Sequence, residues 1–130
     1  MTQRHTVLLV EDEPFVLTVM ERLLAKLGYE VVSFRDPVEA ALHKGIRAPS
    51  LMITDIVMPG MNGFHLCDVM RDRFPGLPVI FTSGYPLDDL PDDAEALPPN
   101  SRMLSKPFGI DVLRDAVVDM ISRSDVPSGV

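Results

Sequence analysis

The sequence predicts a single α/β domain in which helices cover both faces of a parallel β-sheet. Short apolar runs rich in β-branched residues alternate with segments whose apolar residues recur every three or four positions. Strands that alternate with helices call for a parallel sheet, because each helix returns the chain to the same end of the sheet. The length of 130 residues, of which 46% are hydrophobic, suits one core and leaves little room for a second.

Five segments have the composition of strands. The first, residues 6–10, reads TVLLV, a continuous apolar run typical of a strand buried on both faces. The same criteria predict strands at residues 29–34, 50–54, 78–82 and 102–105. A five-stranded parallel sheet in a chain this short favours the strand order 2-1-3-4-5 of the doubly wound, flavodoxin-like fold.

The helices are predicted from their caps and their apolar faces. Proline suits a first helical turn, so Pro14 starts the first helix and Pro37, capped by Asp36, starts the second. The expected inner faces are Val16, Met20, Leu23 and Leu27 before a Gly28 cap; Val38, Ala41, Leu42 and Gly45; Phe64, Cys67, Met70 and Phe74; and Leu113, Val117, Met120 and Ile121.

One segment departs from the alternation. Residues 85–100, YPLDDLPDDAEALPPN, stand where a fourth helix is due, but Pro91 would break a continuous helix. We expect at most a short or distorted helix there. Residues 125–130 are typical of a tail or linker stub.

Composition excludes several function classes. A net charge of −7 argues against direct binding to nucleic acid or to an anionic membrane, since both need a concentrated basic face. The single cysteine, Cys67, cannot form an internal disulfide and suits a reducing compartment. The apolar run Val7 to Val10 is too short for a secretory signal or a membrane span, so a cytoplasmic protein is expected.

Polar side chains follow four of the five predicted strands. They are Glu11 and Asp12, Asp55, Ser83, and Lys106. The carboxyl ends of parallel strands meet at one edge of the sheet, and ligands bind there at the switch in strand order. We therefore expect these side chains to share one crevice.

The chemistry of this set points to phosphoryl transfer. Carboxylates that lie close together repel one another unless one is protonated or a cation neutralises them, and Mg²⁺ suits a site of a few carboxylates, water and a phosphate. A carboxylate such as Asp55 can be the nucleophile and form an aspartyl phosphate, whose oxygens Lys106, Ser83 and a metal would hold.

Structural explanations remain open for each residue. Asp55 could be an ordinary loop acid and Lys106 a surface lysine. Glu11 and Asp12 could cap the helix at Pro14, a role that does not exclude metal binding. Ser83 could serve only the turn at Gly84, and Cys67 is expected to be a small core residue.

Four motifs, in order and each at a strand end, carry a family resemblance. LLVEDEP, MITDIVMPGMNG, PVIFTSGY and LSKPF resemble the receiver domains of bacterial two-component response regulators, and the resemblance runs from about Thr6 to Ser122. It implies a receiver domain over residues 1–124. It also implies that Asp55 accepts a phosphoryl group from a sensor histidine kinase or a histidine phosphotransfer protein.

The resemblance also implies roles for the residues around Asp55. Asp12 would bind Mg²⁺ directly and Glu11 through water, and the Val57 carbonyl would be a further ligand. Ser83 and Lys106 would contact the phosphoryl oxygens, with Lys106 before a cis bond to Pro107, and Gly63 would allow a tight entry into the third helix.

The chain departs from the family at the switch position. Many receivers carry an aromatic residue three positions before the lysine, where this chain has Met103, while Tyr85 follows the serine by two. The FTSGY run is similar to a receiver subgroup, best known in alphaproteobacteria, that lacks the usual aromatic. The hypothesis is that Tyr85 and the loop after it carry the switch.

The predicted function is a phosphorylation-dependent signalling switch, not an enzyme that turns over a metabolite. No output domain is recognised in these residues, so the chain would be a single-domain regulator or a receiver from a hybrid kinase. It would be a monomer or a weak homodimer with an unknown downstream target. The alternatives are a small Mg²⁺-dependent phosphohydrolase, which typically needs a second acid where Val57 stands, and a degenerate receiver that only binds partners.

Overall fold

The computed structural model describes residues 5–84 and 97–124. They form a five-stranded parallel sheet of order β2-β1-β3-β4-β5, which confirms the predicted fold class and strand order. The strands are β1 (Thr6–Val10), β2 (Glu30–Phe34), β3 (Leu51–Asp55), β4 (Val79–Ser83) and β5 (Ser101–Ser105). Each lies within one or two residues of its predicted range.

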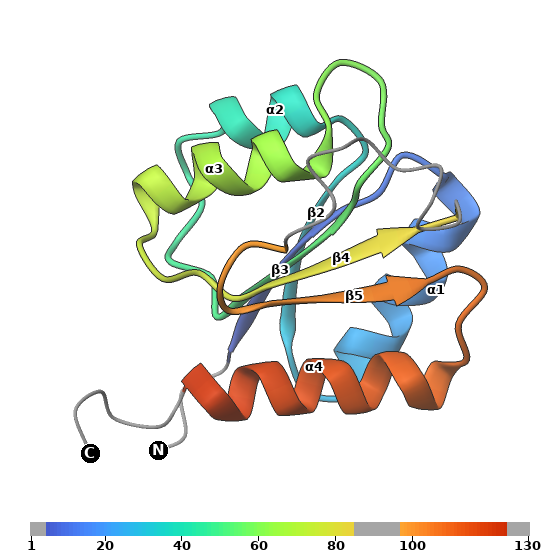
Figure 1. The fold of residues 1–130 in the computed structure, drawn as a ribbon. Helices are drawn as coiled ribbons and strands as arrows, with labels where there is room; N and C mark the ends of the chain where they lie inside the picture. The colour runs from blue at the N-terminus through green and yellow to red at the C-terminus, as the bar shows by residue number, and fades with distance from the viewer. Residues whose placement is uncertain (1–4, 85–96, 125–130) are drawn as a thin grey trace.

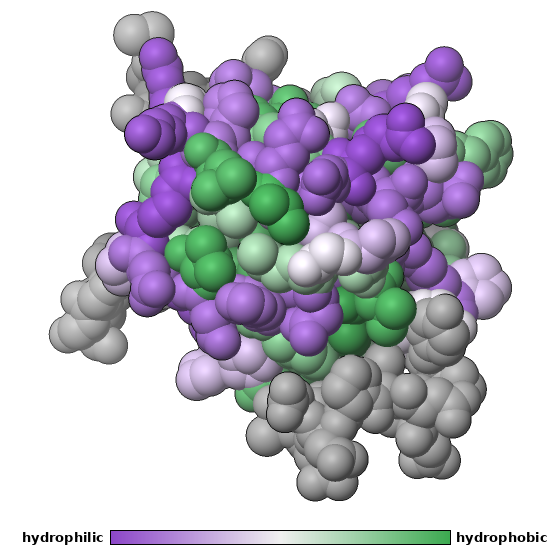
Figure 2. Space-filling view, turned by 90° about the horizontal axis from the view of Figure 1, so that it is seen from above, coloured by the Kyte–Doolittle hydropathy of each residue, from purple (hydrophilic) through white to green (hydrophobic). Residues whose placement is uncertain are grey.

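Helices cover the sheet on both faces (Figure 1). One face carries α2 (Pro37–Leu42) and α3 (Gly63–Arg73), and the other carries α1 (Pro14–Lys26) and α4 (Ile110–Ser124). Each interface has its own apolar cluster, because successive strand side chains point to opposite faces. Leu8 and Val10 thus belong to the cluster under α2 and α3, and Val7 and Leu9 to the cluster under α1 and α4. Figure 2 looks onto the α2 and α3 face and shows hydrophilic side chains over most of it, with smaller hydrophobic areas between them.

The predicted inner face of α1 is confirmed at Met20 but is displaced by about one position elsewhere. The buried residues are Leu17, Met20 and Leu24, whereas Val16 and Leu23 lie half-buried beside them. The helix carries two overlapping apolar stripes, and its contact with the sheet decides which one is covered. Gly28 follows the helix with φ +92°, a left-handed conformation that favours glycine.

The inner face predicted for α2 was also wrong. Asp36 caps the helix as expected, accepting a hydrogen bond from the Val38 amide at 2.9 Å. The buried residues, however, are Pro37 and Ala40, and Leu42 is 72% exposed. A helix of six residues makes fewer than two turns, so only a few of its side chains can reach the core.

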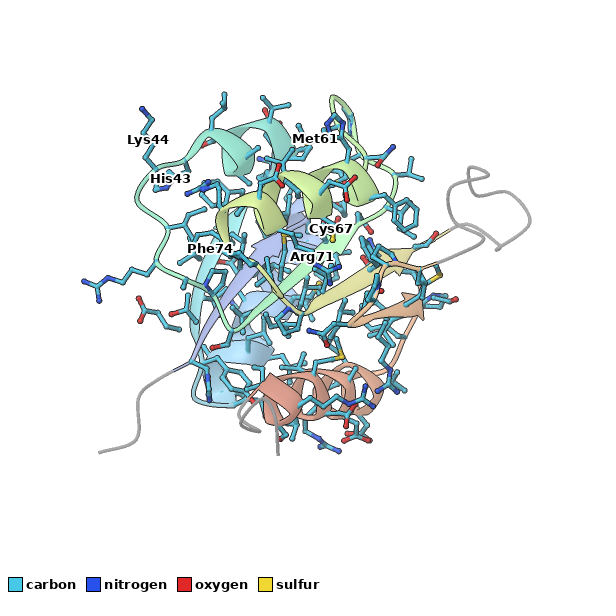
Figure 3. All side chains as sticks on the ribbon, turned by 60° about the vertical axis from the view of Figure 1, so that its left-hand side comes forward. His43, Lys44, Met61, Cys67, Arg71 and Phe74 are labelled. Atoms are coloured by element: carbon cyan, nitrogen blue, oxygen red, sulfur yellow. The ribbon has the colours of Figure 1, made fainter. Side chains whose placement is uncertain are left out.

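The buried face predicted for α4 is confirmed, and that of α3 is confirmed at Phe64, Cys67 and Met70, although Leu66 is also fully buried and was not predicted. Cys67 lies on the sheet side of α3 and is fully buried, as expected of a core residue (Figure 3). Burial raises the pKa of its thiol. The helix ends at Arg73, so Phe74 packs against the core from just beyond it. The buried residues of α4 are those predicted, and Ala116 is buried as well.

The prediction of a distorted helix falls mostly outside the described residues. Of the segment 85–100, the structure describes only residues 97–100, which contain a turn before β5. Among the helices that it describes, none has both the length and the apolar character needed to cross a bilayer.

Candidate functional site

The carboxyl ends of β1, β3 and β5 bring three of the predicted site residues together. In Figure 1 the arrowheads of β4 and β5 point to this edge of the sheet. Glu11 directly follows β1, Asp55 is the last residue of β3, and Lys106 directly follows β5. Glu11 is 2% exposed and Asp55 is 7% exposed, so two carboxylates are buried side by side. Asp55 is therefore not an ordinary loop acid.

The ammonium group of Lys106 joins these carboxylates. Its Nζ donates a hydrogen bond to Glu11 Oε1 at 2.6 Å, and lies 2.9 Å from Asp55 Oδ1 and 3.0 Å from Oδ2. Only 23% of the Lys106 side chain is exposed, so it is not a surface lysine. Such charge-assisted bonds are short and strong, and partial burial reduces their screening by solvent.

One ammonium does not fully compensate the carboxylates. Burial, together with a hydrogen bond to Asp55 and the charge on Asp55, raises the pKa of Glu11 to about 7, although Lys106 opposes the shift. Burial acts to lower the pKa of Lys106, but the hydrogen bonds to Glu11 and Asp55 and their charges outweigh it, and this pKa is raised. The site therefore favours a further positive charge.

Asp12 completes an acidic cluster with Glu11 and Asp55. Each offers one carboxylate oxygen, and these oxygens lie within 4.8 Å of one another. Hard oxygen ligands at this spacing are what a small divalent cation prefers. The alternative that Glu11 or Asp12 is the helix N-cap was wrong, because Glu13 is the N-cap of α1 and its side chain makes no capping hydrogen bond. Glu11 Oε2 does accept a hydrogen bond from the Glu13 amide at 3.4 Å, just before the helix.

Ser83 ends β4 at the same edge, beside Lys106. Ser83 is 3% exposed, and its backbone carbonyl accepts a hydrogen bond from the Lys106 amide at 2.7 Å. The Lys106–Pro107 peptide bond is cis, as the family resemblance implies. Val57 lies in the loop after β3 and is 46% exposed.

Thr82 is a site residue that the sequence analysis missed. Its hydroxyl donates a 2.7 Å hydrogen bond to Asp55 Oδ1, and the residue is 2% exposed. Thr82 is the direct neighbour of Asp55 in the β3–β4 register, so the two side chains lie on the same face of the sheet. The signal in the sequence is that Thr82 is the polar last residue of the otherwise apolar predicted strand 78–82, one position before the predicted site residue Ser83.

Gly63 allows the chain to fold closely over Asp55. A Cβ at this position would lie 2.2 Å from the Asp55 backbone oxygen and 3.1 Å from Ile56 Cα. The Gly63 amide donates to the Ile56 carbonyl at 2.8 Å, which ties the start of α3 to the end of β3. A side chain cannot fit here, so the loop carrying Val57 depends on this glycine.

Of the two predicted switch residues, only Met103 lies in the part of the chain that the structure describes. Met103 in β5 is half-buried, pairs in register with Phe81 and packs against the cluster under α2 and α3. Tyr85 lies outside the described residues.

Comparisons with known proteins agree on one family. The family model described as "Response regulator receiver domain" matches residues 7–118. The response regulator receiver protein CpdR of Brucella abortus (strain 2308) is 35% identical over 111 residues, a match that covers 85% of this chain and 89% of CpdR.

Further similarity extends to a larger protein and to a solved structure. The sensor kinase CckA of the same organism is 35% identical over 124 residues, and the match covers 92% of this chain but only 13% of the kinase. The crystal structure of a response regulator receiver protein from Sinorhizobium medicae WSM419 superposes with a TM-score of 0.83 and 26% identity, covering 95% of this chain and 98% of that one. The chain therefore belongs to the response regulator receiver domains, the signalling domains of two-component systems.

Proposed function

We propose that this chain is a phosphorylation-dependent switch in which Asp55 accepts a phosphoryl group from a sensor histidine kinase or a histidine phosphotransfer protein. The observation that carries the proposal is the Lys106 ammonium held between the buried carboxylates of Glu11 and Asp55. A partly buried cation beside a carboxylate nucleophile is placed to attract and hold a phosphoryl group.

Asp55, Lys106 and Ser83 have different roles in the phosphoryl transfer. An oxygen of Asp55 forms a bond to phosphorus as the bond from phosphorus to the donor breaks, and the donor keeps that electron pair. Lys106 and the Ser83 hydroxyl contact the phosphoryl oxygens. Hydrolysis returns the protein to its unphosphorylated state. Water attacks phosphorus, the bond between Asp55 and phosphorus breaks, the Asp55 carboxylate is regenerated, and inorganic phosphate and a proton are released.

Glu11, Asp12 and Asp55 fit the Mg²⁺ ion that receiver domains typically bind. Their oxygens lie within 4.8 Å of one another, and burial, together with Asp55, raises the pKa of Glu11 although Lys106 opposes the shift. We infer that these acids, with the Val57 carbonyl, hold the ion. When bound, Mg²⁺ supplies positive charge that offsets the negative charge of the phosphoryl oxygens.

An apolar groove beside the site fits a helical phosphodonor. It has a volume of about 540 Å³, lies between α1 and the start of α4, and reaches Lys106 and Gly84. Phe15, Val19 and Ile110 line it and are 75%, 41% and 59% exposed. We infer that the phosphohistidine-bearing helix of the kinase or phosphotransfer protein docks here, because the groove opens next to the acceptor and helices dock in such grooves through apolar side chains.

The central experiment is labelling by a small phosphodonor. The protein is incubated with acetyl phosphate and MgCl₂, and its intact mass is measured. We expect one phosphoryl adduct that Asp55→Asn abolishes. Continuous phosphate release on a substrate panel without an adduct would support the phosphohydrolase alternative, and no adduct at all would support a receiver that only binds partners.

Docking is tested with donors that differ in size. A panel of autophosphorylated sensor kinases identifies a protein donor, and acetyl phosphate serves as the donor that needs no docking. Phe15→Asp should slow transfer from the protein donor by about tenfold, which corresponds to the loss of one apolar anchor. It should leave acetyl phosphate labelling unchanged. Val118→Asp is the matched control, because Val118 is an exposed residue of α4 that does not line the groove.

We further propose that residues 1–124 form the receiver domain, that residues 125–130 are a tail or a linker stub, and that the protein acts in the cytoplasm. Tyr85, rather than Met103, carries the response to phosphorylation. NMR spectra of Tyr85→Ala with and without a phosphoryl mimic test this, and an unchanged response of residues 84–100 would contradict it.

A further inference from the structure

Thr82 distinguishes between the two carboxylate oxygens of Asp55. Lys106 Nζ lies 2.9 Å from Oδ1 and 3.0 Å from Oδ2, so it does not distinguish them. The Thr82 hydroxyl donates to Oδ1 at 2.7 Å. Both residues are buried at the ends of paired strands, where neither side chain has room to turn freely.

We propose that Thr82 is a positioning residue that holds Oδ1 of Asp55, leaves Oδ2 to take the phosphoryl group, and thereby shortens the lifetime of the phosphorylated state. This inference rests on the proposed phosphorylation of Asp55. It adds a residue one position before Ser83, and its effect runs through the Asp55 carboxylate and not through contact with the phosphoryl group.

The direction of the effect follows from the charge on Oδ1. In free Asp55 the carboxylate charge is shared by both oxygens, and Oδ1 is a strong hydrogen-bond acceptor. In the acyl phosphate, Oδ2 is bonded to phosphorus and Oδ1 is a neutral carbonyl oxygen, which is a weaker acceptor. The Thr82 hydrogen bond therefore stabilises the free carboxylate more than the phosphorylated form.

The same hydrogen bond should accelerate hydrolysis. When water attacks phosphorus, the Asp55–phosphorus bond breaks and its electron pair returns to the carboxylate. Negative charge grows on Oδ1 as this happens, and a hydroxyl already aimed at Oδ1 stabilises it without reorganisation. Removal of the hydroxyl should slow this step.

Thr54 provides a matched control on the neighbouring strand. It is the same residue type, is fully buried and directly precedes Asp55. Its hydroxyl donates to the backbone oxygen of Asp55 at 3.0 Å, not to the carboxylate. Thr54→Val and Thr82→Val thus remove the same buried group at comparable depth, and only the second removes a donor from Oδ1.

The test measures the half-life of the adduct. Wild type, Thr82→Val, Thr82→Ser and Thr54→Val are labelled with acetyl phosphate and MgCl₂, the donor is removed by desalting, and the adduct is followed by intact mass. We expect Thr82→Val to lengthen the half-life by about tenfold, the size of effect expected from losing one hydrogen bond to a charged acceptor. Its labelled fraction at a fixed acetyl phosphate concentration should also rise. Thr82→Ser, which keeps the hydroxyl, and Thr54→Val should stay close to wild type.

Several outcomes would overturn the proposal. A Thr82→Val half-life equal to that of wild type would do so, as would an equal lengthening in Thr54→Val or a shortening in Thr82→Val. If Thr82→Val does not fold, by circular dichroism and thermal melting, Thr82→Ala makes the same removal with a smaller side chain, against Thr82→Ser. Absence of any adduct on wild type would refute the proposed function itself, so the two failures are distinguishable.

Discussion

The two ends of the sheet satisfy their polar groups in opposite ways. At the amino end, Arg71 donates to the carbonyls of Leu77 at 3.0 Å and Asn100 at 3.2 Å, and Asn100 donates to the Gly76 carbonyl at 3.1 Å. These donors meet backbone acceptors and connect neighbouring loops. At the carboxyl end, Glu11 and Asp55 are like charges buried together around a single ammonium group.

This difference indicates that the hydrogen bonds at the amino end are structural and that the charged groups at the carboxyl end serve the proposed function. Donors that meet neutral carbonyls stabilise loops and leave no excess charge. Buried like charges are unfavourable unless a cation or a proton joins them, and perturbed pKa values of this kind are typical of functional sites. Burial and the neighbouring Asp55 raise the pKa of Glu11, which agrees with the proposal that the carboxyl end is the functional site.

The largest effect is expected when the ammonium group is removed. Lys106→Met should slow labelling by acetyl phosphate by about 100-fold, because a positioned charge on the phosphoryl oxygens is lost. Arg71→Met should lower the free energy of unfolding but leave labelling within about twofold of wild type, because its guanidinium donates to the carbonyls of Leu77 and Asn100 at the opposite end of the sheet from Asp55. Initial rates from intact mass measure both. Equal losses in the two variants would refute the contrast between the ends.

The next largest effect is expected on stability, when one glycine at each end of the sheet is replaced by alanine. Gly63→Ala should lower the free energy of unfolding by about 3 kcal/mol, because the new Cβ would meet the Asp55 backbone oxygen, which cannot easily move. Gly76→Ala should cost about 1 kcal/mol, because only its φ of +78° opposes a side chain and the space around it is open. Urea denaturation measures both, and a smaller loss at Gly63 than at Gly76 would contradict the prediction.

Loss of one acid at the carboxyl end should weaken metal binding. Asp12→Asn should raise the dissociation constant for Mg²⁺ by about tenfold, since it removes one charged ligand from the cluster. The rise in Tm that MgCl₂ produces in wild type should shrink accordingly. Asp72→Asn, an exposed acid on α3, is the control and should bind Mg²⁺ as wild type does. Isothermal titration calorimetry would contradict the assignment if Asp12→Asn also bound Mg²⁺ unchanged.

The smallest effect is a pH dependence of stability in the absence of metal. The pKa of Glu11 is raised from 4.5 to about 7 by burial and by Asp55, so between these values the folded state holds more protons than the unfolded state. The free energy of unfolding should therefore fall as pH rises across this window, by an amount on the order of 1 kcal/mol. Urea titrations in EDTA at both ends of the window measure it. Glu11→Gln should flatten this dependence, and an unchanged slope would assign it to another group.

The sequence predicted the fold well because its signals are local. Continuous apolar runs mark strands buried on both faces, and the caps at Asp36 and Gly28 lie where the composition placed them. The helix faces were less well predicted. In α1 and α2 several apolar residues compete for the same contact, and only packing against the sheet selects Leu24 over Leu23, or Ala40 over Leu42.

In the candidate site too, the sequence determines some features and the tertiary structure determines others. The sequence by itself determined which chemical groups stand at the strand ends, because the strand pattern fixes where Glu11, Asp55, Ser83 and Lys106 occur and parallel pairing sends them to one edge. Only the tertiary structure decided how they are joined. Strand register set Thr82 against Asp55, and the fold of the β5–α4 loop set Lys106 between two carboxylates distant in sequence. Spacing along the chain specifies neither, because lateral register and side-chain direction depend on the packing of the whole sheet.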